Sequence, residues 1–317
     1  MTDAFGREIY YLRLSVTERC NLRCRYCMPA EGICKKSHEE MLTEDEMILA
    51  VEAAAALGFK KLRITGGEPL VKKNLLSICS RAAAVDGIED ICLTTNGTLL
   101  PHLAKPLREA GVSRVNISLD TLDREKYAYM TRRGALSSAL AGIESAIDAG
   151  FTRIKINTVL IGGFNDSEIC DLAALTVNYP VDVRFIELMP MDGSRGFDQA
   201  AMLPCETVLD RLPELKPIEA DDGVARLYRL PGARGNIGLI SPVSRHFCAA
   251  CNRIRLTAGG KLRPCLHSSA EYSIKGLDFD GMVEQFQKAV LGKPMCHGEL
   301  SAVKRSGAGR MMNRIGG

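Results

Sequence analysis

CNLRCRYC, residues 20–27, carries three cysteines, with three and then two residues between them. The run Tyr11–Val16 directly before it is rich in branched and aromatic residues and predicts a first β-strand. The thiolates of Cys20, Cys24 and Cys27 can hold three irons of a 4Fe–4S cluster, whereas ferredoxin-type clusters use four cysteines. Such a set leaves one iron open to a substrate or cofactor. A structural zinc site is the alternative, although zinc normally takes four ligands in paired short spacings.

The composition is that of a globular chain, with 317 residues and a formal net charge of +3. So small a charge gives no argument for nucleic acid or an acidic membrane as a partner. No run has the length of a membrane span, and the first residues lack the features of a secretory signal, so we expect a cytoplasmic protein. Twelve cysteines in a reducing compartment favour metal or cluster binding over disulfides. We expect the cysteines outside the motifs to be small buried residues: Cys34, Cys79, Cys92, Cys170, Cys205 and Cys296.

Strand-like and helix-like segments alternate through the first two-thirds of the chain. The strand candidates are Tyr11–Val16, Lys61–Thr65, Asp90–Thr95, Arg114–Leu119, Arg153–Leu160 and Asp182–Leu188. The helix candidates are Thr43–Leu57, Lys73–Val85, Leu99–Ala110, Leu136–Ala149 and Asp166–Tyr179. Thr43 and Glu46 form a capping-box pattern at the first helix, and Gly58, Gly111 and Gly150 stand where helices should end.

Six strands with five helical crossovers predict a parallel sheet, for which an open sheet and a partial barrel both fit. Polar and glycine-rich residues cluster at the C-terminal strand ends, where ligand sites of α/β proteins are usually built. The pattern changes after Pro190: Met191–Ala201 predicts a loop, Pro204–Leu212 a helix and Asp221–Ile240 a turn with short strands. We therefore expect one domain over residues 1–190 and a smaller α+β region over residues 191–317.

The cysteine loop resembles the signature of the radical S-adenosylmethionine (SAM) superfamily. The longer run LRLSVTERCNLRCRYCMP, residues 12–29, is similar to one branch of it, the molybdenum cofactor biosynthesis protein A or GTP 3′,8-cyclase family. The resemblance implies a partial (β/α)6 TIM-like barrel whose open side is covered by the C-terminal region. It also implies that the open iron chelates SAM, and that cluster reduction releases a 5′-deoxyadenosyl radical.

Several short motifs at the strand ends fit the same family. In Ile64–Pro69, ITGGEP, two glycines permit close backbone approach, and the carboxylate can take a charged amino group. The resemblance assigns SAM contacts to Tyr26, Gly67, Glu68, Ser118 and Met189. It assigns GTP contacts to Arg13, Arg63, Thr94, Lys155, Arg184, Arg253, Ile254 and Arg255. Lys155 is also notable on its own, because a lysine in an apolar strand is unusual without a partner.

A second set of three cysteines follows near the C-terminus, at Cys248, Cys251 and Cys265. By spacing alone, a zinc site completed by His246 or His267 is an equal alternative to a cluster. The run FCAACNRIRLTAGGKLRPCL, residues 247–266, is similar to the family's C-terminal motif, which implies a second 4Fe–4S cluster facing the substrate base. Arginine forks suit phosphate oxygens. The resemblance gives catalytic roles to Arg253, Arg255 and the terminal Gly316 and Gly317.

The expected function is the conversion of GTP to (8S)-3′,8-cyclo-7,8-dihydroguanosine 5′-triphosphate in molybdenum cofactor biosynthesis, by abstraction of the ribose 3′ hydrogen. The resemblance further implies a reductant protein such as flavodoxin or ferredoxin, a downstream cyclic pyranopterin monophosphate synthase, and a homodimer. The alternatives are a radical SAM peptide-modifying enzyme with an auxiliary cluster and a non-catalytic zinc-binding protein.

Overall fold

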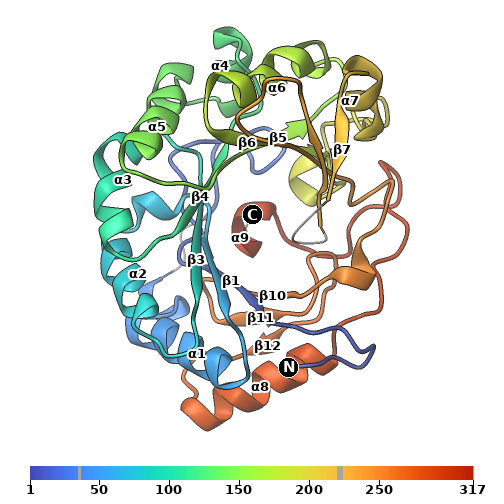
Figure 1. Cartoon of the computed structure of the whole chain (residues 1–317). Coiled ribbons are helices and arrows are strands. Elements are labelled where there is room, and N and C mark those ends of the chain that lie inside the picture. Colours follow the sequence, from blue (N-terminus) through green and yellow to red (C-terminus); the bar gives the residue numbers. More distant parts are fainter. Residues whose placement is uncertain (35–36, 220–223, 317) are drawn as a thin grey trace.

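The computed structural model describes residues 1–34, 37–219 and 224–316 as an open barrel of strands with helices outside it (Figure 1). The first strands are β1 Tyr11–Ser15, β2 Lys61–Thr65, β3 Asp90–Thr95, β4 Arg114–Ser118, β5 Ile154–Leu160 and β6 Val181–Glu187. The helices among them are α1 Glu44–Ala56, α2 Leu75–Ala83, α3 Leu100–Glu109, α4 Arg124–Thr131, α5 Leu136–Asp148 and α6 Ile169–Asn178. The six predicted strands and five predicted helices are therefore present, each within a few residues of its expected bounds.

The C-terminal part of the chain contributes further elements, whose strands extend this sheet at both of its edges. They are α7 Glu206–Arg211, β7 Lys216–Ile218, β8 Arg226–Arg229, β9 Ile237–Ile240, β10 Arg253–Leu256, β11 Lys261–Arg263, β12 Tyr272–Ser273, α8 Phe279–Leu291 and α9 Met312–Ile315. The strand order is β12-β11-β10-β1-β2-β3-β4-β5-β6-β9-β8-β7. Strands β1 to β6 pair in parallel, and β10 and β9 add parallel strands at either end. The two ends of the order are not paired with each other, which confirms the partial barrel.

Local sequence signals explain where the helices begin and end. Thr43 accepts a hydrogen bond from the Glu46 N–H, and the Glu46 carboxylate accepts one from the Thr43 N–H, which completes the predicted capping box. Gly58, Gly111 and Gly150 have φ values of 85°, 90° and 79°, so they leave the α1, α3 and α5 helices in the left-handed conformation that glycine adopts most easily.

The core lies between the barrel strands and the surrounding helices. Leu14, Ile64 and Leu93 on successive strands are completely buried, and Met47 of α1 packs into the same cluster. Sequence reasoning missed α4, α8 and the pairing of β10 with β1. Of the cysteines expected to be buried, Cys34, Cys170 and Cys296 are exposed. That prediction was wrong because Cys34 and Cys296 lie in loops and Cys170 lies on the solvent side of α6.

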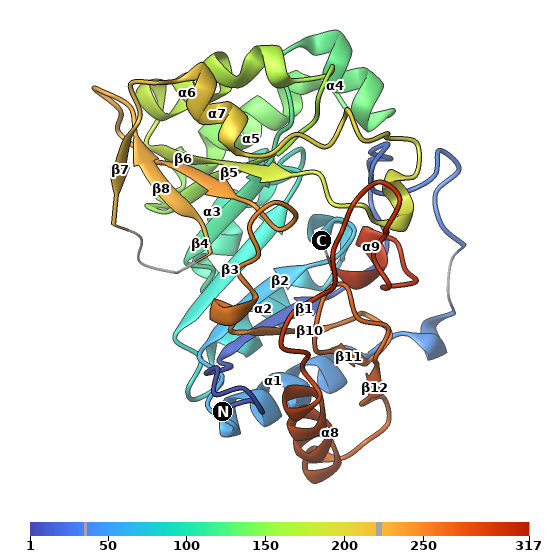
Figure 2. The same cartoon turned by 90° about the vertical axis from the view of Figure 1, so that its right-hand side faces the viewer.

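The C-terminal end of the chain runs into the barrel. Figure 1 shows α9 in the middle of the ring of strands, and Figure 2 shows the segment that leads to it passing alongside β10 and β11. The Asn313 side chain donates to the Glu18 carbonyl at 3.2 Å, so α9 contacts the segment just before the first cysteine. No helix in the described ranges has the length and apolarity needed to cross a membrane.

Candidate active site

A cavity of about 360 Å³ opens inside the barrel. Its wall includes all six cysteines of the two predicted sets: Cys20, Cys24, Cys27, Cys248, Cys251 and Cys265. It also includes most of the predicted ligand contacts: Arg13, Tyr26, Arg63, Gly67, Thr94, Ser118, Arg184, Met189, Arg253 and Arg255. Among the described residues with predicted contacts, Glu68, Lys155, Ile254 and Gly316 do not line it. Gly317 lies outside the described residues.

The loop that carries the first cysteines is fixed by the end of α4. The Arg23 N–H donates to the Thr131 carbonyl at 2.9 Å. The Arg132 guanidinium donates to the carbonyls of Arg23 at 2.8 Å and Met28 at 3.0 Å. Within the described ranges, Arg132 is the single non-glycine residue with positive φ, at 60°. Such strain persists where surrounding contacts enforce it, and here those contacts hold the cysteine loop.

Gly66 and Gly67 lie against the start of that loop. The Gly67 N–H donates to the Thr17 carbonyl at 2.8 Å. A Cβ on Gly66 would lie 2.6 Å from the Thr17 oxygen, and one on Gly67 would lie 2.5 Å from the Arg19 oxygen. Any side chain here would push β2 away from the cysteine loop, which explains why the sequence has two glycines at this point.

The Glu68 carboxylate is buried and ties β2 to β3. It accepts hydrogen bonds from the Thr95 hydroxyl at 2.7 Å and from the N–H groups of Asn96 at 2.6 Å and Leu70 at 3.0 Å. Burial raises the pKa of Glu68 to about 7, although these hydrogen bonds act in the opposite direction. The glycine backbone before Glu68 faces the cavity instead. A SAM contact by Glu68 itself stays a prediction.

The first three thiols lie where isolated thiolates are disfavoured. Burial raises the pKa of Cys20 to about 11 and that of Cys27 to about 12. The pKa of Cys24 is raised well above its usual value by burial, and further by Cys27 and Asp120. Three thiolates are stable together here only when positive charge compensates them. A metal cluster supplies that charge, so the donor set fits one.

Tyr26 and Asp120 lie together on the cavity wall beside these thiols. The Tyr26 hydroxyl donates to Asp120 Oδ2 at 2.8 Å. Burial raises the pKa of Asp120 to about 6, while hydrogen bonds from the Val159 N–H and Tyr26 oppose the rise. The pair places one carboxyl group and one aromatic ring beside the predicted SAM site.

Three arginines stand side by side on adjacent strands. Arg13 of β1 is in register with Arg255 of β10 on one side and with Arg63 of β2 on the other. The pKa of Arg13 is held well below its usual value by burial and by the charges of Arg255 and Arg63. Burial, with Arg253, lowers the pKa of Arg255 to about 9. Guanidinium groups that are buried together in this way favour a bound anion.

The other predicted GTP contacts surround this row. Arg63 donates to the Tyr11 hydroxyl and, at 3.0 Å, to the Thr94 hydroxyl. Lys155 Nζ lies 4.0 Å from the Asp182 carboxylate, which accounts for this lysine within a strand. The Ile254 side chain is fully buried in the core. The GTP contacts assigned to Lys155 and Ile254 therefore stay predictions.

The second cysteine set is held by two buried cations that sequence reasoning missed. Lys293 is only 3 % exposed, and its ammonium donates to the carbonyls of Pro264 at 2.8 Å and Arg253 at 3.0 Å. Although burial acts in the opposite direction, Arg253 and Lys293 lower the pKa of Cys251 to about 7. This cysteine is therefore prepared to bind metal as a thiolate.

Arg7 is the second of these cations. Its guanidinium donates to the carbonyls of Cys248, Pro294 and Met295 at 2.8–2.9 Å. Its Nε also donates to the Asp3 carboxylate at 2.6 Å. Neither Lys293 nor Arg7 lies in a motif. Their roles could not be recognised from the sequence, because they depend on partners that only folding brings together.

The C-terminal tail reaches the same arginine row. Arg255 Nη1 donates to the Gly316 carbonyl at 2.9 Å. Gly316 has a φ of 81°, and a Cβ on it would lie 2.6 Å from the Thr65 hydroxyl and 3.0 Å from Ser15. The tail therefore enters the barrel as far as Gly316, and only glycine fits at that position.

The chain matches two known protein families over most of its length. Residues 14–176 match the model of the radical SAM superfamily, and residues 181–297 match that of the Molybdenum Cofactor Synthesis C family. Two curated proteins named GTP 3′,8-cyclase, from Alkaliphilus oremlandii and Moorella thermoacetica, are 47 % and 46 % identical to it, over the full length of both chains in each case. The chain belongs to the GTP 3′,8-cyclase family of radical SAM proteins.

Solved structures show the same fold at low sequence identity. Streptococcus suis SuiB has a TM-score of 0.65 and 13 % identity, with 91 % of this chain and 67 % of that chain covered. Native anSMEcpe with bound AdoMet has a TM-score of 0.60 and 16 % identity, with 88 % of this chain and 82 % of that chain covered. Family membership gives the chain two 4Fe–4S clusters and SAM as cofactors, in agreement with the two cysteine sets on one cavity.

Proposed function

We propose that this chain is a GTP 3′,8-cyclase that makes (8S)-3′,8-cyclo-7,8-dihydroguanosine 5′-triphosphate for molybdenum cofactor biosynthesis. Full-length relatives carry that name. The observation that carries the proposal is the buried row of Arg255, Arg13 and Arg63 on the same cavity as both cysteine sets. A row of buried guanidinium groups suits a polyanion such as a triphosphate, and the cysteines bring metal chemistry to the same space.

The residues then divide into two groups of ligands. Cys20, Cys24 and Cys27 would hold the cluster that binds SAM, and Cys248, Cys251 and Cys265 would hold the second cluster. When bound, the first cluster and SAM supply a 5′-deoxyadenosyl radical that abstracts the ribose 3′ hydrogen. Gly66 and Gly67 line the cavity, so their backbone would face the methionyl group of SAM. The contacts assigned to Tyr26, Ser118 and Met189 belong to this proposal.

The protein's own contribution is to hold the nucleotide and exclude water. Arg13, Arg63 and Arg255 would bind the phosphates and thereby orient the ribose toward the first cluster, with Arg184 and Arg253 nearby on the wall. Arg255 also holds the Gly316 carbonyl, so phosphate binding and tail position are coupled through one guanidinium. The tail fills space in the barrel that water would otherwise occupy.

The test is an anaerobic turnover assay with GTP, SAM and a strong reductant, followed by identification of the product by mass spectrometry and NMR. Formation of the 3′,8-cyclised nucleotide together with 5′-deoxyadenosine is expected. Reconstituted protein with about eight irons per chain that cleaves SAM yet gives no cyclised nucleotide would contradict the proposal. Zinc without sulfide would support the non-catalytic alternative, and tight GTP binding would count against a peptide substrate.

The proposal extends to the surroundings of the enzyme. We propose a cytoplasmic location, electron supply by a small reductant protein of the flavodoxin or ferredoxin type, and transfer of the product to cyclic pyranopterin monophosphate synthase. We also propose a homodimer, which sedimentation of the reconstituted protein would test.

A further inference from the structure

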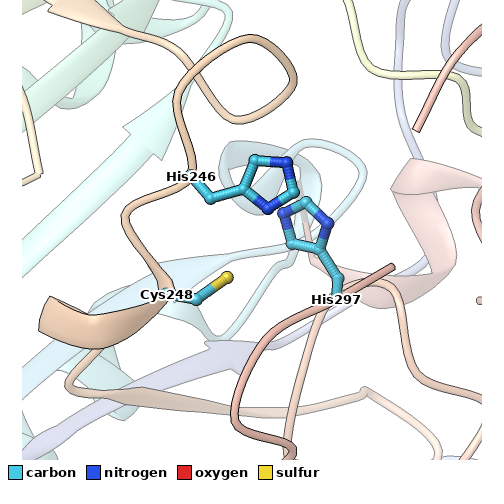
Figure 3. Close-up of side chains that lie close together, drawn as sticks. All are labelled: His246, Cys248 and His297. Atoms are coloured by element: carbon cyan, nitrogen blue, oxygen red, sulfur yellow. The ribbon is translucent and has the colours of Figure 1, made fainter. Parts of the chain in front are cut away.

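Three of the chain's five histidines gather beside the second cysteine set, and two of them meet a thiol. His246, Cys248 and His297 have ligand atoms that all lie within 4.8 Å of one another. Figure 3 shows both imidazoles facing each other above the Cys248 sulfur. The His246 and His297 ring centroids are 4.3 Å apart, and the His267 ring is 4.6 Å from that of His297.

The spacing of these atoms is close to that of ligands to a single ion. Zinc binds thiolate sulfur at about 2.3 Å and imidazole nitrogen at about 2.0 Å, so two ligand atoms on one tetrahedral zinc lie roughly 3.3–3.5 Å apart. Side-chain rotations that move the three atoms by on the order of 1 Å would bring them to these distances, because the atoms lie within 4.8 Å of one another. Elsewhere in the described ranges, no cysteine, histidine or carboxylate group meets this spacing, including either set of three cysteines. The cysteine sets are thus spaced more widely than one ion requires, as a multi-iron cluster needs.

One ring is already oriented as a ligand. His297 Nδ1 lies 2.8 Å from the Gly298 carbonyl, and because a carbonyl only accepts, Nδ1 must carry the proton. Nε2 of His297 is then left with its lone pair, which is the arrangement that metal-binding histidines show. His246 is exposed, so an ion can enter from solvent and keep water as a fourth ligand.

We propose that His246, Cys248 and His297 form a mononuclear zinc site that the chain fills while its second cluster is absent. Two imidazoles and one thiolate with an open position suit Zn²⁺ in a tetrahedral geometry. Cys248 is then shared between two metal centres, so zinc and the second cluster exclude each other. This sharing rests on the proposed function, whereas the zinc site itself does not.

The site would be tested in full-length protein with Cys20, Cys24 and Cys27 replaced by alanine, kept anaerobic and free of iron. Zn²⁺ affinity is measured by competition with a chromophoric chelator. The combined change His246→Ala and His297→Ala should weaken binding at least tenfold. The combined change Cys251→Ala and Cys265→Ala should leave it within about twofold. His102→Ala, on the exposed face of α3, is the matched control and should have no effect.

X-ray absorption at the zinc edge should show one sulfur and two nitrogen ligands in the parent protein. Zinc retained by the double histidine variant but lost from the double cysteine variant would overturn the proposal in favour of a three-thiolate site. Loss from both variants would also overturn it, because the ligand set would then differ from the one proposed. If the double histidine variant does not unfold cooperatively, His297→Gln alone gives the same comparison.

A second measurement uses the wild-type chain. Equimolar Zn²⁺ added before anaerobic reconstitution should lower the iron content from about eight toward about four atoms per chain. The double histidine variant should resist this loss. Equal loss in both proteins would contradict the competition for Cys248, and turnover is not needed for this readout.

Discussion

Arg255 joins three features of the cavity: the arginine row, the second cysteine set and the C-terminal tail. Its replacement by alanine should weaken GTP binding about 10- to 100-fold, since a hydrogen bond to a charged group contributes about 1.5–3 kcal/mol. Arg255→Lys should recover part of the affinity, because it keeps the charge but not the planar fork. Isothermal titration with GTP under anaerobic conditions measures both. The control is Arg229→Ala, an exposed residue at the end of β8. Unchanged GTP affinity in Arg255→Ala would exclude a phosphate-binding role for Arg255.

Lys293 offers a test of how the second cysteine set is held. Lys293→Met removes the donor to two carbonyls and one of the charges that lower the pKa of Cys251. Reconstituted iron should fall from about eight toward about four atoms per chain, while SAM cleavage at the first cluster continues. Lys288→Met, an exposed lysine of α8, should keep full iron. Full iron in Lys293→Met would show that Lys293 is not needed to hold the cluster.

The site residues differ in how well their roles could be predicted from the sequence. The six cysteines could be predicted because their spacing is local, whereas the roles of the arginines were predicted from the family resemblance. Lys293 and His297 lie about 30 residues beyond the last motif cysteine, and their roles depend on which carbonyl or sulfur they meet after folding. Glu68 was predicted from a motif; its carboxylate joins β2 to β3 through Thr95 and Asn96, and its contact with SAM stays a prediction.

At the scale of elements, α4 supports the cysteine loop through Arg132. Both Arg132→Gly and Arg132→Ala should lose iron to a chelator about 5- to 150-fold faster, since each removes two hydrogen bonds worth about 0.5–1.5 kcal/mol each, or about 1–3 kcal/mol together. The glycine variant should unfold at a higher temperature than the alanine variant, because φ is 60° here. Chelator kinetics followed by the visible absorbance of the cluster, with calorimetry, check both. If both variants lose iron at the same rate as the unsubstituted protein, the contact of Arg132 with the cysteine loop does not hold the cluster.

The contact between α1 and α2 gives a pH test. Hydrogen bonds from Ser77 and Asn74, both at 2.5 Å, and then Arg81 hold the pKa of Glu44 below its usual 4.5. The carboxylate therefore stabilises the fold above pH 4.5, and this contribution is lost as the pH falls through the lowered folded pKa. Glu44→Gln should lower the free energy of unfolding by about 1 kcal/mol at pH 7 and by less at pH 4. Urea unfolding at pH 7 and at pH 4 measures this effect. The same difference in the free energy of unfolding at both pH values would contradict the prediction.

The elements themselves were predicted unevenly. The six barrel strands could be recognised from apolar runs with polar ends. Helix α4 was missed because REKYAYMT has only eight residues, too few for the buried Tyr127, Met130 and Thr131 to establish a helical period. Helix α8 did carry a signal, with Asp278 as N-cap and apolar residues at Met282, Phe286 and Val290, but its place in a loop-rich region concealed it. The pairing of β10 with β1 has no local signal, because strand partners are chosen by the whole fold.

For the whole molecule, the tail position makes a prediction about coupling. Gly316→Ala should displace the tail, because the added Cβ meets Thr65 and the left-handed φ strains any other residue by about 1–2 kcal/mol. Cyclised product should fall at least tenfold while SAM cleavage continues without it, and the thermal unfolding temperature should hardly change. Gly309→Ala is the control, since it shares a positive φ of 62° but has open space around it. Normal product yield in Gly316→Ala would exclude a role for the tail.

The position of β1 between β2 and β10 also has a consequence for synthesis on the ribosome. Residues 11–15 emerge early, but their outer partner, residues 253–256, is translated about 240 residues later. At roughly 5–20 residues per second, this edge waits about 12–48 seconds for its neighbour. During that time the nascent chain exposes an unpaired strand edge, together with the first three thiols. Chaperones and iron–sulfur carriers would therefore meet an unfinished barrel whose first cysteine loop is still accessible.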